Sequence, residues 1–315
     1  MAVLPSKSEL QEAYARVSPH VHKTPVLTSR LLNEISGAQL YFKGENFQRM
    51  GAFKMRGAIN AILNLTDDQR KNGVVTHSSG NFGQAVALAA QSLGVTAYIV
   101  MPENAPSVKK KAVASYNGQI TECESTIEAR EANAKSIEQQ TGASFLHPSN
   151  DMDVILGNAT AGVELLEAHP NLDIIITPVG GGGLLAGVAL AAHYHGSGCV
   201  TMAGEPMQVD DAYRSLQTGT IQYNEKTTTI ADGLRTHLGD INFPIIQQLV
   251  DSIIRVEEDE ILAAMKLIWE RLKIVVEPSS AVPFAAILKQ PATFKDKKVG
   301  IIISGGNVDL AHLPF

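Results

Sequence analysis

The sequence predicts an α/β protein built on two open sheets of parallel strands. Strand-like and helix-like segments alternate from residue 73, which is typical of a parallel sheet whose strands are joined by helices. The alternation returns in the second half, where residues 173–179 are apolar enough for a strand buried on both faces. We expect residues 73–150 to form a small domain of about four parallel strands, and residues 1–72 and 151–315 to form a larger one.

The first 72 residues carry signals for two helices and a strand. Ser6 and Glu9 have the spacing of a capping box, which predicts a helix that runs to Val17. Residues 38–43 alternate between apolar and polar side chains as a strand does, and residues 57–65 carry apolar side chains on one helical face.

The small domain is expected to contain four strands separated by three helices. Gly94 and Gly142 are the expected ends of two of these helices, and Ser125 with Glu128 marks a capping box at the start of the last one. The expected strands are 74–77, 96–101, 119–122 and 143–147, and the expected helices are 82–93, 108–116 and 125–142.

The second half repeats the pattern with a more apolar content. Ile261, Met265, Ile268 and Leu272 mark the core face of one helix. The other expected elements are strands at 173–179, 200–204 and 298–303 and a helix at 184–194.

Composition limits the class of protein. Of the 315 residues, 44% are hydrophobic and 18% are charged, which suits a folded protein, and the net charge of −6 offers no basic surface for nucleic acid. No apolar run approaches the roughly 20 residues of a membrane span, and the N-terminus has no signal-peptide pattern. Cys123 and Cys199 are too few for a disulfide framework or a zinc site. We therefore expect a cytoplasmic protein that binds neither nucleic acid nor membrane.

Lys54 lies between small and aromatic residues, with Gly51 and Phe53 before it and Gly57 after it. Small residues let the backbone approach a flat ligand, and burial lowers the pKa of a lysine from about 10.4, which frees the amine as a nucleophile or base. Taken alone, the pattern is more typical of a surface lysine beside a turn. Three distant loops change that interpretation.

The first loop, Gly180 to Gly183, connects a buried strand to a helix. Its four glycines leave amide N–H groups unshielded at a helix N-terminus, where the helix dipole favours an anion. The loop lacks the Walker lysine and the Rossmann glycine spacing, so ATP and NAD are poor fits. A tight turn is the alternative, but such turns rarely need four glycines, and we expect a phosphate group here.

The second and third loops also follow strands. Residues 78–81 offer two hydroxyls, an amide and backbone N–H groups to a carboxylate, although helix capping accounts for the same residues. Residues 304–307 lie where open α/β sheets place their ligands, and Ser304 could hydrogen-bond a ring nitrogen without protonating it. An amine, a phosphate cup, a carboxylate cup and a ring anchor together match pyridoxal phosphate carrying an amino acid.

With these loops the chain resembles the fold-type II pyridoxal phosphate enzymes, which share the fold of the tryptophan synthase β subunit. Within that group it is similar to the serine racemases and the serine/threonine dehydratases. The resemblance covers nearly the whole chain and rests on residues 51–57 (GAFKMRG), 76–81 (THSSGN), 178–183 (PVGGGG), 229–233 (TIADG) and 304–310 (SGGNVDL). It implies a large cofactor-binding domain and a small, mobile domain that closes over the substrate.

The resemblance also implies roles for individual residues. Lys54 would hold the cofactor through its amine and then move the substrate's α-proton on one face, while Ser79 would act on the opposite face. Ser304 would contact the pyridine nitrogen, and such a neutral partner favours elimination and racemisation over transamination. The other cofactor-binding residues would be Phe53, Asn81, Gly180, Gly181, Gly182, Gly183 and Leu184, and the substrate-binding residues would be Ser78, Ser79, Gly80, Asn81, Arg130 and Thr236. Arg130 is equally well explained as a solvated helix charge, and Phe82 stands where vertebrate serine racemase has a histidine.

An acidic segment follows the strand at residues 200–204. Glu205 and Asp211 offer oxygen ligands, which suit Mg²⁺, Ca²⁺ or Mn²⁺ rather than zinc. Spacing alone favours a solvated acidic turn. The resemblance to serine racemase implies a divalent cation bound by Glu205, Asp211 and the backbone carbonyl of Val209. It also implies a homodimer, and ATP as an activator at a site that matches Gln84, Tyr116 and Asn307.

The function that this resemblance implies is a serine racemase that also dehydrates L-serine to pyruvate and ammonia. Three alternatives on the same scaffold are an L-threonine dehydratase, a threo-3-hydroxyaspartate dehydratase and an aspartate racemase, since Arg130 would favour a second carboxylate in the substrate. A non-catalytic amino-acid sensor is a further alternative, against which the intact Lys54 and Ser79 argue. The sequence leaves the choice among these substrates open.

Overall fold

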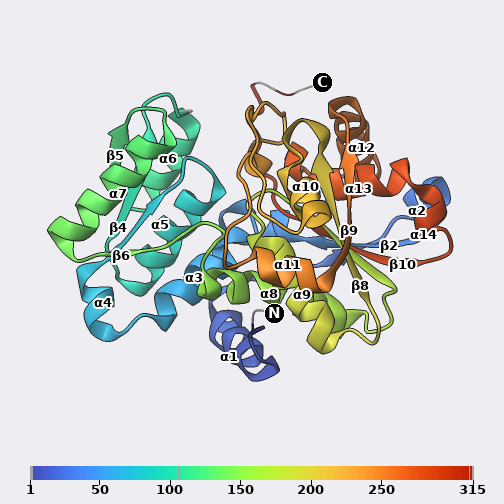
Figure 1. The fold of residues 1–315 in the computed structure, drawn as a ribbon, viewed down its shortest axis with the longest axis horizontal. Helices are drawn as coiled ribbons and strands as arrows, with labels where there is room; N and C mark the ends of the chain where they lie inside the picture. The colour runs from blue at the N-terminus through green and yellow to red at the C-terminus, as the bar shows by residue number, and fades with distance from the viewer. Residues whose placement is uncertain (1–2, 106, 312, 314–315) are drawn as a thin grey trace.

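The computed structural model describes residues 3–105, 107–311 and 313 (Figure 1). Its strands form two separate sheets. The smaller sheet has four strands in the order β5-β4-β3-β6, all parallel, as the sequence predicted. These strands are β3 (Val74–His77), β4 (Ala97–Pro102), β5 (Gln119–Cys123) and β6 (Ser144–Phe145).

Helices cover both faces of the small sheet. Side chains of α5 (Asn81–Leu93) and α6 (Ser107–Ser115) pack with Val74 on one face, and those of α7 (Ile127–Thr141) pack with Val75 on the other. The short helix α4 (Asp67–Asn72) leads into β3. The predicted cap of α7 is wrong by one residue: Thr126, not Ser125, accepts a hydrogen bond from the backbone N–H of Ala129, because its extended backbone directly precedes the helix.

The larger sheet has six strands in the order β1-β2-β10-β7-β8-β9. Five of them are parallel, but β1 pairs with β2 in the antiparallel direction, so the expected parallel sheet carries one antiparallel edge. Strand β9 was missed by the sequence analysis. The strands are β1 (Val26–Leu27), β2 (Gln39–Gly44), β7 (Ile174–Pro178), β8 (Val200–Pro206), β9 (Val250–Val256) and β10 (Lys298–Ile303).

Two apolar cores lie on the faces of the larger sheet. One contains side chains of α1 (Lys7–Val17), α8 (Met152–Ala168), α9 (Gly183–His195), α10 (Asp211–Thr218) and α11 (Phe243–Leu249). The other contains side chains of α2 (Arg30–Ser36), α12 (Glu258–Leu272), α13 (Pro278–Lys289) and α14 (Pro291–Phe294). The capping box of Ser6 and Glu9 is present at the start of α1, as predicted.

Helix α3 (Lys54–Asn64) connects the two halves of the molecule, because it packs against α5 on one side and α8 on the other (Figure 1). The loops that follow β2, β7 and β10 lie at the same edge of the large sheet, since the strands are parallel. The expected domain boundaries at residues 73 and 150 remain a prediction. In the described part of the chain, no helix combines the length and the apolar character needed to cross a membrane.

Candidate active site

Lys54 is the first residue of α3, so the predicted helix starts three residues earlier than the expected residue 57. The segment before it is fixed to the loop after β10: the Phe53 N–H donates to the Ser304 carbonyl at 2.9 Å, and Ala52 forms a β-bridge with Gly305. This pairing places the lysine beside the loop that was predicted to anchor a cofactor ring.

The amine of Lys54 lies in a mostly apolar enclosure. Its Nζ donates a hydrogen bond to the carbonyl of Pro148 at 2.7 Å and lies 5.0 Å and 5.5 Å from the ring centroids of Phe53 and Phe82. Burial lowers the pKa of Lys54 to about 8, and the nearby charge of Glu277 acts in the opposite direction. At pH 7 about a tenth of this amine is therefore unprotonated, far more than for an ordinary lysine, and that fraction can attack an aldehyde.

The loop of four glycines leads from β7 into α9 and is buried. A Cβ on Gly181 would lie 2.4 Å from Ser149 Oγ and 2.9 Å from Thr236 Oγ1, so no larger residue fits there without displacing its neighbours. Gly182 has a φ of +81°, which favours glycine. The start of α9 has no side-chain cap, which leaves its first amide N–H groups available to an anion. A phosphate fits this donor set, and Leu184 lies within the same turn.

Asn81 links the second and third loops. Its Nδ2 donates to both carboxylate oxygens of Glu277 at 3.1 Å, and its Oδ1 accepts from Asn307 Nδ2 at 2.9 Å. Ser304 is buried, with its Oγ 2.9 Å from Ser280 Oγ. The second and third loops are thus brought together although they lie 226 residues apart along the chain.

Glu277 is a site residue that the sequence analysis missed. It lies directly before α13 and is 4% exposed, and burial together with the charge of Asp232 raises the pKa of its carboxyl group to about 7. A carboxyl that exists in both protonation states near neutral pH can accept from Asn81 or donate a proton. The only local signal was an acidic residue directly before a proline, a pattern that normally indicates only the start of a helix.

The remaining predicted substrate residues bond to their own loops and helices or lie against the glycine loop. Ser78, Ser79 and Gly80 lie in the partly exposed loop after β3, where Ser78 Oγ accepts from the Gly80 N–H at 3.3 Å. Arg130 lies in the first turn of α7, and its Nε donates to the Thr126 carbonyl of the preceding turn at 3.2 Å. Thr236 is exposed and lies against the glycine loop. Of the residues predicted to contact ATP, Asn307 donates to the Met50 carbonyl and to Asn81 Oδ1.

Glu205 near the end of β8 and Asp211 at the start of α10 are both buried, which contradicts the interpretation of these carboxylates as parts of a solvated turn. Glu205 is 0% exposed and accepts from the backbone N–H groups of Ala212 and Tyr213 at 2.9 and 2.8 Å. Asp211 is 1% exposed, its Oδ1 accepts from Asn224, and its buried Oδ2 has no hydrogen-bond partner among the described residues. Burial raises the pKa of Asp211 to about 7, and burial with the Asp211 charge raises that of Glu205 well above its usual value.

A cation suits this arrangement, because it would pair the free oxygen of Asp211 and offset two adjacent buried carboxylates. Val209, whose carbonyl was the third predicted ligand, lies on the intervening short helix and is fully buried. Hydrogen bonds between β7 and β8 place Glu205 beside the glycine loop. The described residues hold no group of three or more histidine, cysteine or acidic side chains suited to a metal, so main-chain carbonyls or water would have to complete the coordination.

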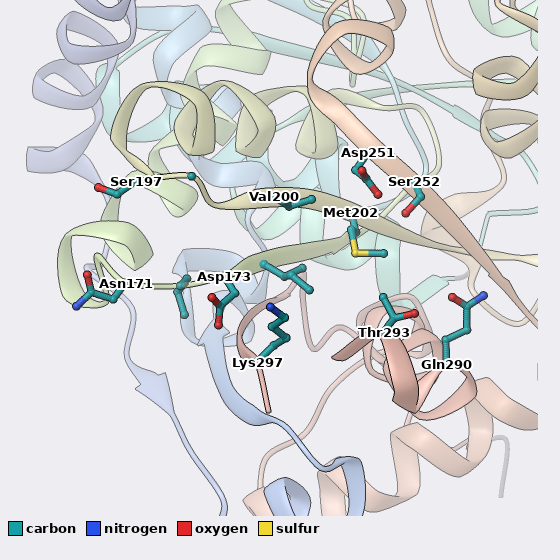
Figure 2. A pocket seen from close by; sticks show the side chains of 13 residues that line it. Asn171, Asp173, Ser197, Val200, Met202, Asp251, Ser252, Gln290, Thr293 and Lys297 are labelled. Atoms are coloured by element: carbon teal, nitrogen blue, oxygen red, sulfur yellow. The ribbon is translucent and has the colours of Figure 1, made fainter. Parts of the chain in front are cut away.

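A hollow of about 660 Å³ lies at the opposite edge of the large sheet, at the amino ends of its strands (Figure 2). Its lining includes Asp173, Asp251 and Lys297, which are exposed side chains. No predicted site residue lines this hollow, and the predicted glycine loop and Ser304 loop lie at the other edge of the sheet.

A family model described as "Pyridoxal-phosphate dependent enzyme" matches residues 17–305. The chain belongs to this family. A serine racemase from Dictyostelium discoideum is 52% identical over 311 residues, which covers 97% of this chain and 95% of the relative. A β-hydroxyaspartate dehydratase from Paracoccus denitrificans is 46% identical over 312 residues, which covers 99% of each chain. The solved structure of maize serine racemase has a TM-score of 0.95 at 46% identity and covers 96% of this chain and 94% of its own.

These matches confirm the predicted fold class, that of the fold-type II pyridoxal phosphate enzymes. They also confirm the prediction of a pyridoxal phosphate enzyme family, and the relatives of this chain include racemases and ammonia-lyases. The residues of this chain fit the cofactor. They provide a lysine amine of lowered pKa, an uncapped helix start behind a glycine loop, and Ser304, whose carbonyl accepts from the N–H of Phe53 beside that lysine.

Proposed function

We propose that the chain is a serine racemase that uses pyridoxal phosphate and also dehydrates L-serine to pyruvate and ammonia. The observation that carries the proposal is the Lys54 amine with its lowered pKa. The backbone of the preceding residue, Phe53, is hydrogen-bonded to the Ser304 loop, so this amine lies beside that loop. The likeness to serine racemases over nearly the full length supports the same substrate class.

When bound, pyridoxal phosphate supplies an electron sink that makes the α-proton of an amino acid acidic. In the proposed mechanism, Lys54 Nζ holds the cofactor and then takes or returns the α-proton on its own face. The Ser79 hydroxyl performs the same transfer on the opposite face, so that a proton removed from one side and replaced on the other inverts the centre. Loss of the β-hydroxyl as water needs only the lysine face. Hydrolysis of the released dehydrated product then takes up one water and gives ammonia and pyruvate.

The other residues bind and orient. The first amide groups of α9, at Gly183 and Leu184, hold the phosphate, and Gly180 to Gly182 allow the close approach. Phe53 and Asn81 contact the ring, and Ser304 offers its nitrogen a neutral hydroxyl. Ser78, Gly80 and Asn81 bind the substrate carboxylate, while Arg130 and Thr236 approach the substrate when residues 73–150 close over it as a mobile domain.

We further propose that Glu205, Asp211 and the Val209 carbonyl bind Mg²⁺, Ca²⁺ or Mn²⁺, supported by the unpartnered oxygen of Asp211. A homodimer is supported by the exposed apolar side chains of Phe47 and Val275, which belong to neighbouring segments, since Asn46 donates to the Val275 carbonyl. The free cysteines suit a cytoplasmic location. ATP remains a candidate activator.

A dehydratase for threo-3-hydroxyaspartate is the second candidate. It is favoured by the β-hydroxyaspartate dehydratase relative and by Arg130, which could pair with a second carboxylate. Dehydration of L-threonine and racemisation of aspartate are tested in the same experiment.

The deciding experiment is product analysis with purified enzyme. L-serine, L-threonine, L-threo-3-hydroxyaspartate and L-aspartate are supplied in parallel, and chiral chromatography measures D-amino acid while a keto-acid assay measures elimination. We expect D-serine and pyruvate from L-serine, with kcat/KM highest for that substrate. A higher kcat/KM for hydroxyaspartate would favour the second candidate, and Lys54→Ala, which removes the required amine, serves as the inactive control. Binding of amino acids without turnover of any of them would instead favour a sensor.

A further inference from the structure

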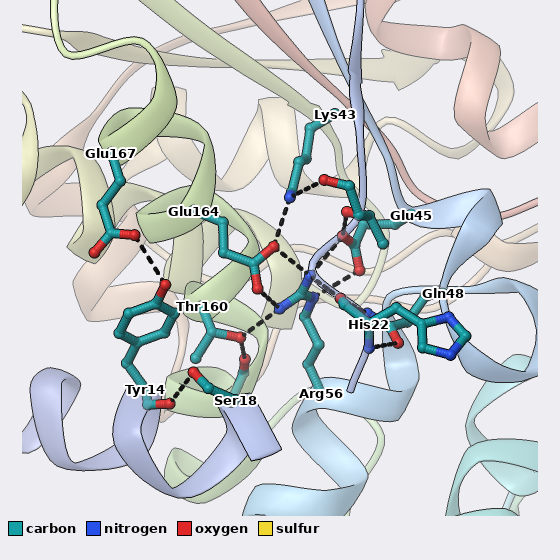
Figure 3. A network of polar contacts seen from close by, with 12 residues as sticks. Tyr14, Ser18, His22, Lys43, Glu45, Gln48, Arg56, Thr160, Glu164 and Glu167 are labelled. Carbon is teal, nitrogen blue, oxygen red and sulfur yellow. Dashed lines mark hydrogen bonds and ion pairs between the residues drawn. The ribbon is translucent and has the colours of Figure 1, made fainter. Parts of the chain in front are cut away.

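A cluster of four buried charges is centred on Arg56, which lies two residues after Lys54 on α3 (Figure 3). It consists of Lys43 on β2, Glu45 directly after β2, Arg56 on α3 and Glu164 on α8, and we call it the buried charge cluster. All four side chains are at most 3% exposed. The proposed chemistry at Lys54 gives this cluster no role.

Arg56 is the centre of the cluster. Its Nε donates to Glu45 at 2.7 Å and its Nη2 to the same carboxylate at 2.9 Å, while Nη1 and Nη2 donate to the two oxygens of Glu164 at 2.8 and 2.9 Å. Nη1 also contacts Thr160 Oγ1 at 3.2 Å, and Nη2 contacts the His22 carbonyl at 3.3 Å. The planar guanidinium is therefore held by two carboxylates at once, a geometry that a lysine cannot reproduce.

These contacts fix the first turn of α3. Arg56 lies two residues after Lys54, and α3 begins without a side-chain cap. In the same region, a Cβ on Gly157 would lie 2.4 Å from the Arg56 carbonyl, so α8 approaches the backbone of this turn closely. The Arg56 side chain ties the turn from one side to the segment after β2 and from the other to α8.

Stability alone does not account for such a cluster. Moving charges out of water costs about as much as their attraction returns, and apolar residues of similar volume often stabilise a protein equally well. Buried ion pairs with directional hydrogen bonds do, however, select one arrangement of the elements that they join. Here the joined elements are those that set the direction of the Lys54 side chain.

We propose that Arg56 is a positioning residue for the cofactor-binding lysine. By holding the first turn of α3 between Glu45 and Glu164, it keeps Lys54 Nζ between the rings of Phe53 and Phe82 and within reach of the cofactor. The inference rests on the proposed role of Lys54 as the residue that holds pyridoxal phosphate.

The test compares Arg56→Lys with Lys43→Met in the full-length holoenzyme. Both substitutions disturb the contacts of Glu164, but only Arg56 lies on α3. Three quantities are measured: the melting temperature, kcat and KM for L-serine, and the fraction of chains whose cofactor is attached to Lys54. The last is read by borohydride reduction followed by peptide mass spectrometry.

For Arg56→Lys we expect a lower fraction of cofactor trapped on Lys54 and a kcat that falls at least about tenfold, since a displacement of roughly 1 Å can cost a hundredfold. KM should change much less than kcat. Lys43→Met should lower the melting temperature but leave the trapped fraction and kcat within about twofold of wild type. Glu45→Gln keeps the shape of its side chain but weakens the hydrogen bonds to Arg56. It should lower the trapped fraction and kcat as Arg56→Lys does, and it tests the proposal if Arg56→Lys fails to fold.

Folded Arg56→Lys or Glu45→Gln enzyme with wild-type kcat and wild-type trapping on Lys54 would overturn the proposal. Equal losses of kcat in Lys43→Met would also overturn it, because the cluster would then support the fold as a whole. If instead the proposed role of Lys54 is wrong, the result is distinguishable, because the wild-type enzyme itself would then carry its cofactor on another lysine or on none.

Discussion

Replacing Gly181 with alanine should weaken the binding of pyridoxal phosphate without removing any functional group. The added Cβ would lie 2.4 Å from Ser149 Oγ, 2.9 Å from Ser149 Cβ and 2.9 Å from Thr236 Oγ1. Contacts this short require the loop or its neighbours to move, and overpacking of this kind costs about 1–3 kcal/mol. If the cost is borne by the loop in its phosphate-binding arrangement, cofactor affinity falls by roughly 5- to 150-fold.

The assay is a titration of cofactor-free enzyme with pyridoxal phosphate, followed by absorbance of the lysine-bound cofactor, with a thermal melt of each variant. The double variant Ser149→Ala with Gly181→Ala is the matched control, because it removes the atom that lies 2.4 Å from the new Cβ. We expect it to recover part of the lost affinity. Wild-type affinity in Gly181→Ala would show that the glycine loop does not hold the cofactor phosphate.

Three other predictions address the remaining parts of the site. Ser79→Ala should lower racemisation at least about a hundredfold, as expected for a lost acid/base group, and L-serine dehydration much less; equal losses of both activities would make Ser79 a substrate-binding residue instead. The rate at which cofactor-free enzyme binds pyridoxal phosphate should rise with pH and level off above about 8, because Lys54 is mostly in its unreactive, protonated form below its lowered pKa; a rate that keeps rising to about pH 10 would contradict that pKa. Chelation should lower the melting temperature of the wild type by about 5 °C and reduce its turnover, Mg²⁺ or Ca²⁺ should restore both, and Asp211→Ala should abolish the response; indifference of the wild type to chelator and cation would refute the metal site.

Local patterns predicted most of the elements in this chain. The capping box of Ser6 and Glu9, the four strands of the small sheet and the glycine ends of α5 and α7 are where the sequence indicated. Some of the differences are shifts at the ends of predicted elements, and others are elements that the sequence analysis did not predict, such as α8 and α13. Thr126 caps α7 in place of Ser125, and α3 starts at Lys54 because its first turn is held by distant contacts. Strand β9 was missed, although it is the edge strand of the large sheet.

The sequence by itself determined the class of fold and indicated Lys54 and three loops as a candidate cofactor site, because strand and helix periodicity, glycine content and an isolated lysine are properties of short segments. Only the tertiary structure decided that Glu277 bonds to Asn81 across 196 residues, that Asp211 is buried with a free oxygen, and that Arg56 joins three elements. These features depend on burial and on pairs that are distant along the chain. Desolvation changes the pKa values of these side chains only after packing has removed them from water, and no local pattern encodes that packing.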